Sequence, residues 1–416
     1  SGFQRTTMIS TDGYLDFSFG RVRIDKILLE EDAARTIEKT DSVVTYSLDR
    51  LGIPLIELVA WHDMHTPEQV KEVALYLGQL FRSTGKTKRG LGSIRQDINI
   101  SIKDGSRVEI KGCQDLDLIP EIINREIVRQ LNLIDIKKEV IEKNLTSFSL
   151  EPIIINDYFK NTSSKVVLKS FSENKNAYLF LLPGFKGFLG REIQPNRRLG
   201  TEIASVLKMR TTLKGLFHLD ELPNYGITEK DVEVIKKDFS VKENDSFIII
   251  FSSDYEISSV KNVIEDRLNK LKEGVLKETR ASTVEGNTEY QRPLSTSSRM
   301  YPETDLSPIV FNDELLALAK KEIPLSLEDR KKLYVDTFNL SSQLADKMKL
   351  NNFAPIFEKI VSEYKINPTT LSVFLLEDLI KASREGVLDL DDINDSLLIS
   401  FFKTKDLFNR INKNKL

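Results

Sequence analysis

The spacing of apolar residues changes twice along this chain of 416 residues, and each spacing allows a different kind of fold. Before about residue 150, short apolar runs and strict alternation are typical of strands. Between about 151 and 274, the apolar runs 177–182 and 247–251 predict buried strands, and residues 258–271 predict a helix. After Pro324, helical spacing takes over, with an apolar stripe from Phe353 to Tyr364 that we interpret as core. Three such patterns do not fit one compact core, so we expect several domains of the α+β class.

Composition excludes several classes of protein. Hydrophobic residues make up 40% of the chain and charged residues 30%, which excludes wholesale disorder. No apolar run approaches the roughly 18 residues that a transmembrane helix needs. The single cysteine, Cys113, cannot form an internal disulfide, which indicates a reducing compartment. A net charge of -3 argues against nucleic-acid binding over the whole surface but leaves local basic patches open.

We divide the chain into segments 1–152, 153–275, 276–312 and 313–416. The first mixes strands and helices, the second is an α+β unit, the third is an extended return to the first, and the last is helical. Thr66 as N-cap and Pro67 at the first helical position predict a helix over 67–81, and residues 119–131 predict another. Because residue 1 is Ser and sheet-like sequence follows at once, we expect a fragment of a longer first domain.

Residues 97–102 and 107–110 predict a β-hairpin. Its register follows from the alternation of apolar and polar residues, because the two strands must place their apolar residues on the same face. A two-residue turn would pair Ile100 with Glu109, mixing apolar and charged residues on one face. A three-residue loop over 103–105, with Gly105 in the left-handed conformation, pairs Ile100 with Val108 instead. The second register places the polar side chains of both strands on one face. That face either holds phosphate and a metal ion or is an ordinary solvated face. The residues on that face are Arg95, Asp97, Asn99, Arg107, Glu109 and Lys111.

Glu57 stands within the apolar run 53–59, which we interpret as a buried strand. An unpaired carboxylate there would cost several kcal/mol, so we expect a partner or a cation. A second acidic cluster lies at residues 30–32. Carboxylates from separate strands suit Mg²⁺, which takes one or two protein oxygens together with phosphate and water. The alternative for residues 30–32 is the acidic first turn of a helix.

Two basic stretches, 82–103 and 194–215, are either nucleic-acid contacts or solvated faces. Gly85-Lys86-Thr87 fails as a P-loop, because position 80 is Leu where the motif needs Gly. His62 and His65 precede a predicted helix start, and we favour a loop over a metal site.

Several motifs resemble, in order, the kinase subunit of tRNA-dependent amidotransferases. They are residues 29–34, 51–57, 92–99 and 108–111. Residues 1–6, 88–92, 112–116 and 299–305 are similar to the archaeal E form of that subunit rather than the B form. The middle segment, through residues 185–190 and 200–203, is similar to the insertion domain of bacterial-type aspartyl-tRNA synthetase, which the B form lacks.

The resemblance implies an α+β fold: a mixed-sheet kinase cradle interrupted by that insertion domain, followed by a helical tRNA-binding domain at 313–416. It also implies a cytoplasmic, ATP- and Mg²⁺-dependent carbon–nitrogen ligase with no role on membranes or DNA. ATP would phosphorylate the γ-carboxylate of Glu-tRNA(Gln). Ammonia from an asparaginase-like partner, the D component of the amidotransferase, would then displace the phosphate.

The same resemblance implies roles for individual residues. Glu31 and Glu57 match the family's Mg²⁺ ligands. Four residues lie in motifs lining the cradle, namely Arg95, Asp97, Glu109 and Lys111, with Arg95 and Lys111 expected to contact ATP. In the second basic stretch we expect tRNA contacts from Arg197, Arg198 and Lys208. The family's N-terminal strand, with a further His ligand, and part of its tail domain are expected to be missing here.

Two other functions stay open. One is a B-type subunit that pairs with an amidase, and the insertion argues against it. The other is a non-catalytic tRNA-binding scaffold, against which the carboxylate-rich face argues.

Overall fold

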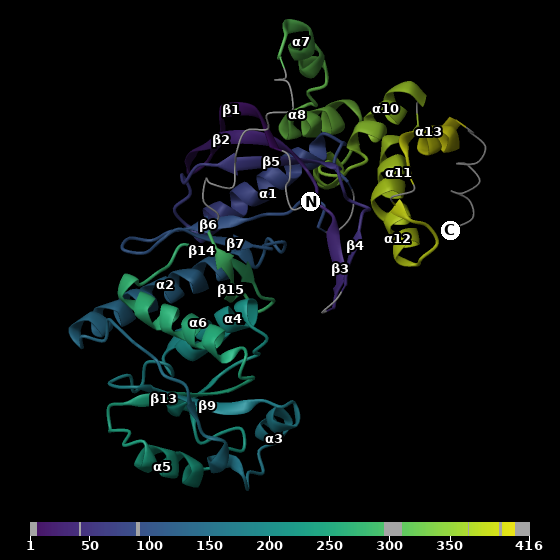
Figure 1. Cartoon of the computed structure of the whole chain (residues 1–416). Coiled ribbons are helices and arrows are strands. Elements are labelled where there is room, and N and C mark those ends of the chain that lie inside the picture. Colours follow the sequence, from purple (N-terminus) through teal and green to yellow (C-terminus); the bar gives the residue numbers. More distant parts are fainter. Residues whose placement is uncertain are drawn as a thin grey trace. The chain divides into compact units, whose positions relative to one another are not determined.

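The computed structural model describes residues 6–40, 43–88, 92–294, 310–364, 366–390 and 393–403. The chain forms two compact units, unit 1 over residues 1–95 and 302–416 and unit 2 over residues 96–301 (Figure 1). Residues 1–5, 89–91 and 299–305, which belong to motifs used above, lie outside the described residues. The mixture of helices and small sheets confirms the α+β class. The predicted domain boundaries stay predictions.

Unit 1 contains strands and, after residue 312, a series of short helices. Its strands and first helix are β1 (Thr6–Phe17), β2 (Gly20–Glu31), β3 (Arg35–Lys39), β4 (Val44–Ser47), β5 (Pro54–Ala60) and α1 (Pro67–Ser83). Its later elements are α7 (Asp313–Lys321), α8 (Leu327–Lys332), the π-helix η5 (Leu333–Thr337), α9 (Ser342–Lys349), α10 (Ala354–Tyr364), α11 (Pro368–Val373), the π-helix η6 (Phe374–Asp378), α12 (Leu379–Arg384) and α13 (Asp395–Lys403).

An antiparallel sheet in the order β1-β2-β5 forms the β part of unit 1. Helix α1 begins as predicted, because Thr66 accepts a hydrogen bond from the Gln69 backbone and the Gln69 side chain accepts one from Thr66. The prediction that residues 53–59 form a buried strand is only partly right. They form β5, but β5 lies at the edge of the sheet, and Ile56 and Glu57 are exposed.

The helical part of unit 1 has its own apolar core, as the stripe that begins at Phe353 predicts. Phe353, Ile356, Phe357 and Ile360 are at most 3% exposed and pack with Tyr334 and Leu375. Asn367 ends the preceding pattern and caps α11, where its side chain accepts a hydrogen bond from the Thr370 backbone.

Unit 2 contains two four-stranded sheets and the helices that cover them. Its strands are β6 (Ile98–Ile100), β7 (Val108–Lys111), β8 (Ile153–Ile154), β9 (Asn176–Leu182), β10 (Glu192–Gln194), β11 (Arg197–Arg198), β12 (Phe217–His218), β13 (Ser246–Ser252), β14 (Glu278–Ser282) and β15 (Thr288–Pro293). Its helices are α2 (Ile119–Glu142), α3 (Lys165–Ser172), α4 (Leu199–Arg210), α5 (Glu229–Asp238) and α6 (Ile257–Asn269), with short 3₁₀ turns η1 (Asn156–Phe159), η2 (Leu219–Glu221) and η3 (Lys270–Glu273).

The first sheet of unit 2 joins segments far apart in the chain. Its order is β15-β14-β7-β6, and β14 pairs with β7 in parallel. The second sheet, β12-β13-β9-β8, confirms the two apolar runs as buried strands, since β13 is buried along its length. Helix α2 runs beyond the predicted end at 131, because Leu133, Ile136 and Val140 continue its buried stripe.

A buried network of charged side chains joins β14 to the helices behind it. Arg280 donates to both carboxylate oxygens of Glu202, at 2.6 and 2.9 Å, and to Glu278 at 3.1 Å. Arg129 donates to Glu202 at 3.0 Å and to both oxygens of Glu126 at 2.9 Å. All five residues are at most 6% exposed. Burial alone would raise the pKa of Glu202, but Arg280 and Arg129 outweigh it and hold that pKa below its usual range.

None of the helices within the described ranges is long and apolar enough to span a lipid bilayer.

Replacing Arg280 with Ala should destabilise unit 2 by about 3–5 kcal/mol, because the buried Glu202 carboxylate loses two hydrogen bonds and Glu278 loses one, together with a positive charge shared by both. Denaturant unfolding measures the loss. Lys138→Ala, which removes an exposed ion pair to Asp135 with both side chains about two-thirds exposed, is the matched control and should cost about 1 kcal/mol or less. Equal losses for both variants would contradict a stabilising network.

His218 on β12 should make unit 2 less stable in acid. Burial lowers its pKa from 6.5 to about 4, and its Nδ1 has no hydrogen-bond partner among the described residues. Between these pH values the unfolded chain binds the proton and the native chain does not, so stability falls as pH drops from about 6.5 to 4. The shift corresponds to roughly 3 kcal/mol. His218→Gln should flatten this pH dependence in urea titrations, and an unchanged pH slope would contradict the assignment.

Candidate active site

The polar face predicted for the hairpin exists in unit 2 and continues onto β14 and β15. Ile100 pairs with Val108, Asn99 with Glu109 and Ile98 with Ile110, which confirms the register obtained from the alternation of apolar and polar residues. The apolar partners are at most 7% exposed and lie on the opposite face. Glu109 pairs in turn with Thr279 of β14, so the polar face extends across the parallel pairing.

The loop of the hairpin differs from the prediction in one respect. Asp104, not Gly105, has the left-handed conformation, with φ of 62°. Asp tolerates this region because its side chain is short and polar. Gly105 is required for a different reason, since a Cβ atom at this position would clash with the side-chain oxygen of Gln130 and lie 2.9 Å from Ile102.

Three predicted site residues meet on this face. The Lys111 ammonium donates to Asp97 Oδ2 at 2.6 Å and lies 3.5 Å from Glu109 Oε1. Thr279 donates its hydroxyl proton to Glu109 Oε2 at 2.8 Å, which fixes the second oxygen of that carboxylate. The Lys111, Asp97 and Glu109 side chains are partly exposed and so accessible to a ligand, whereas Thr279 is buried beneath them.

The electrostatics of this cluster keep Lys111 charged. Burial alone would lower the pKa of Lys111, but the hydrogen bond from Lys111 to Asp97 and the negative charges of Asp97 and Glu109 outweigh it and raise the pKa. Cys113 follows two residues later and is 1% exposed. Burial, and next the charge of Asp97, raise the pKa of its thiol to about 12, so it stays protonated and is no nucleophile.

Sequence reasoning missed two members of this face, Thr279 and Arg292. Arg292 pairs with Thr279, whereas Tyr290 pairs with Arg280 on the buried face. Residues 290 and 292 would share a face in a regular strand, and the bulge in the pairing of β14 with β15 separates them. Residues 285–287 give a turn signal that could have revealed the hairpin, but nothing local in the sequence reveals the bulge.

The predicted metal ligands lie in unit 1, on the adjacent strands β2 and β5. Glu57 pairs with Leu28 and Glu31 pairs with Pro54. Positions 28 and 31 of β2 lie on opposite faces of a regular strand, and Glu30, which pairs with Leu55, shares the face of Glu57. The role of Glu31 and Glu57 as metal ligands stays a prediction.

Two arguments about these carboxylates were wrong. Glu57 is exposed, so burial does not force a cation upon it. Residues 30–31 end β2, so they are not the first turn of a helix. Arg95 also belongs to unit 1, where its guanidinium lies 4.0 Å from Asp32.

No group of three or more His, Cys, Asp or Glu side chains in the described ranges is arranged to hold a metal ion. His62 and His65 are exposed in the loop before α1, as expected. A Mg²⁺ ion here would take few protein ligands and complete its shell with phosphate and water.

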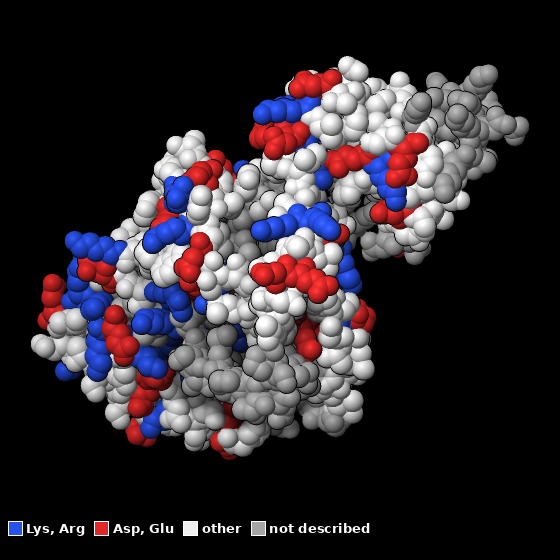
Figure 2. Space-filling model, turned by 90° about the horizontal axis from the view of Figure 1, so that it is seen from above, with Lys and Arg blue, Asp and Glu red and all other residues white. Residues whose placement is uncertain are grey.

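The three predicted tRNA contacts differ in their surroundings. Arg197 is 13% exposed, and it donates to Glu289 at 2.6 Å and to Ser205 at 3.0 Å, so it serves an internal ion pair. Arg198 and Lys208 are exposed on and beside α4. Figure 2 shows basic and acidic side chains interspersed over the face that it presents.

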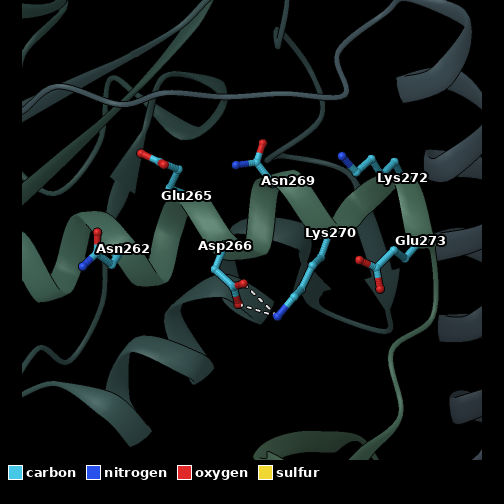
Figure 3. A pocket seen from close by; sticks show the side chains of 7 residues that line it. All are labelled: Asn262, Glu265, Asp266, Asn269, Lys270, Lys272 and Glu273. Atoms are coloured by element: carbon cyan, nitrogen blue, oxygen red, sulfur yellow. Dashed lines mark hydrogen bonds and ion pairs between the residues drawn. The ribbon is translucent and has the colours of Figure 1, made fainter.

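A shallow depression of about 400 Å³ lies along α6 and η3 (Figure 3). Its side chains hold the chain in place: Glu265 accepts from the Leu150 backbone at 3.0 Å, Asn269 bonds the Phe148 backbone, and Lys272 donates to Thr146. Asp266 and Lys270 form an ion pair at 2.7 Å. These bonds assign the depression a structural role.

The GatB/GatE catalytic domain matches residues 1–317 of the chain. The chain is 42% identical over 406 residues to the E component of glutamyl-tRNA(Gln) amidotransferase from Methanocaldococcus jannaschii, covering 97% of this chain and 64% of the relative. It is 44% identical over 416 residues to the protein of the same name from Methanobrevibacter smithii, covering 100% of this chain and 65% of the relative. The chain therefore spans less than two thirds of the length of these relatives.

Proposed function

The chain belongs to the GatB/GatE catalytic domain family, and from that premise we propose that it activates a carboxylate with ATP in a tRNA-dependent amidotransferase. The substrate is Glu-tRNA(Gln), which is the tRNA in the relatives' names. The γ-phosphoryl group of ATP passes to the γ-carboxylate, giving an acyl phosphate and ADP. Ammonia then displaces phosphate and gives the amide.

The observation that supports this proposal is the cluster of Lys111 with Asp97 and Glu109 on one accessible sheet face. Phosphoryl transfer depends mainly on positioning and on neutralising charge, and it needs no protein nucleophile. A bound Mg²⁺ ion would offset the negative charge of the phosphate groups. In this chain Glu31 and Glu57 would be its protein ligands, with Glu30 beside Glu57 on the same face of the sheet.

We propose further that residues 1–152 and 276–312 belong to the kinase cradle, and that residues 153–275 are an insertion like that of aspartyl-tRNA synthetase. The long crossover from β7 to β14 supports an insertion at this place. The helical segment from residue 313 would bind the body of the tRNA. An asparaginase-like partner would supply ammonia in the cytoplasm.

Replacing Asp97 with Asn should reduce ATP cleavage dependent on Glu-tRNA(Gln) at least about a hundredfold, because Lys111 loses its closest charged partner. Glu57→Gln should act alike through the metal. The assay uses the full-length protein with its ammonia-supplying partner and radiolabelled ATP. Filter binding measures tRNA affinity, which both variants should retain.

Asp104→Asn is the matched control, because it removes a carboxylate from the exposed loop of the same hairpin and Asn tolerates the left-handed conformation. It should keep full activity. Wild-type activity of Asp97→Asn would exclude this face as the kinase site. A wild-type complex that binds tRNA but never cleaves ATP would favour the scaffold alternative.

Replacing both Arg198 and Lys208 with Ala should weaken tRNA binding and reduce the slope of log affinity against log salt by about one to two units. Binding titrations at several ionic strengths measure the slope. Arg197→Gln removes a neighbouring cation that already serves Glu289, so its slope should stay at the wild-type value. Equal slopes for all three proteins would show that α4 does not contact the tRNA backbone.

A further inference from the structure

The bulge between β14 and β15 turns one cation onto the polar face. Arg292 pairs with Thr279, which pairs with Glu109, so these three residues form one row across three strands. Bulges are frequent beside active sites, where they redirect a side chain. The Arg292 side chain is exposed, so it can reach a ligand.

Lys111 alone does not balance the negative charge of the carboxylates beside it. Asp97 and Glu109 carry two negative charges against the one positive charge of Lys111, which leaves the cluster at -1 and unfavourable for a phosphate anion. Arg292 brings the sum of these four residues to zero, and Arg107 is a further cation predicted for the same face. Among the described residues, Arg292 has no carboxylate within ion-pair distance. The positive charge of Arg292 acts on Lys111 and opposes the rise of its pKa, which places the two cations within electrostatic reach.

We propose that Arg292 binds the phosphate chain of the nucleoside triphosphate beside Lys111. A guanidinium binds phosphate oxygens through two parallel hydrogen bonds, whereas Lys111 is committed to Asp97 and Glu109. Lys111 therefore organises the carboxylates, and Arg292 supplies the direct contact to phosphate. This assignment rests on the proposed function, since it names a further residue of the same site.

The test compares binding of ATP with Mg²⁺ and binding of adenosine to the full-length protein, by isothermal titration calorimetry. Arg292→Ala should raise the ATP dissociation constant about tenfold or more and leave that of adenosine within about twofold. Arg292→Lys should restore part of the ATP affinity, because it keeps the charge but loses the paired hydrogen bonds. Lys236→Ala, which removes a partly exposed cation on α5, is the control and should bind both ligands as wild type does.

The outcomes separate this assignment from the proposed function. Wild-type protein that binds no ATP overturns both. Wild-type protein that binds ATP, with an unchanged dissociation constant for Arg292→Ala, overturns the role of Arg292 alone. An equal loss of ATP and adenosine in Arg292→Ala, at an unchanged unfolding temperature, would also overturn a phosphate contact, because adenosine has no phosphate.

Discussion

The buried ion-pair network centred on Arg280 fixes the strand on which the candidate site depends. Arg280 is inaccessible to solvent and binds Glu202 with two hydrogen bonds, while its neighbour Thr279 points to the other face and bonds Glu109. A slip of β14 by one residue would exchange these faces, bringing Thr279 into the network and Arg280 onto the site. Such a slip removes the Arg280 hydrogen bonds from the buried Glu202 carboxylate, so the network selects one register.

That constraint matters because the sheet is assembled from two distant segments. Strand β7 ends at Lys111, and β14 begins at Glu278. The segment between them has its own apolar core around β9 and β13. Parallel pairing of β7 with β14 gives no tight turn to hold the register. Glu202 of α4 lies within the intervening segment, so its bonds to Arg129 and Arg280 tie that segment to helix α2 and strand β14.

The sequence predicts what is local and fails where distant segments meet. The hairpin register follows from alternation over 14 residues, and the start of α1 follows from Thr66 and Pro67. The burial of Glu57 was misjudged, because apolar neighbours do not distinguish an edge strand from a central one. Motif position predicts Glu31 as a metal ligand, and the face of the sheet on which Glu30 and Glu31 each lie becomes visible only through the pairing with β5. The bulge that turns Arg292 outward has no local signal at all.

Basic residues show why composition cannot replace this geometry. Arg197 and Arg198 are adjacent in sequence, yet Arg197 is 13% exposed and bound to Glu289, while Arg198 faces solvent. On the polar face, Lys111 is bound to two carboxylates, while Arg292 is accessible. In both pairs, one cation forms an ion pair within the protein, while the other is accessible to an anionic ligand. A basic stretch therefore predicts a binding surface only through those cations that do not already form ion pairs within the protein. A cluster that contains carboxylates attracts phosphate only where a second cation offsets their negative charge.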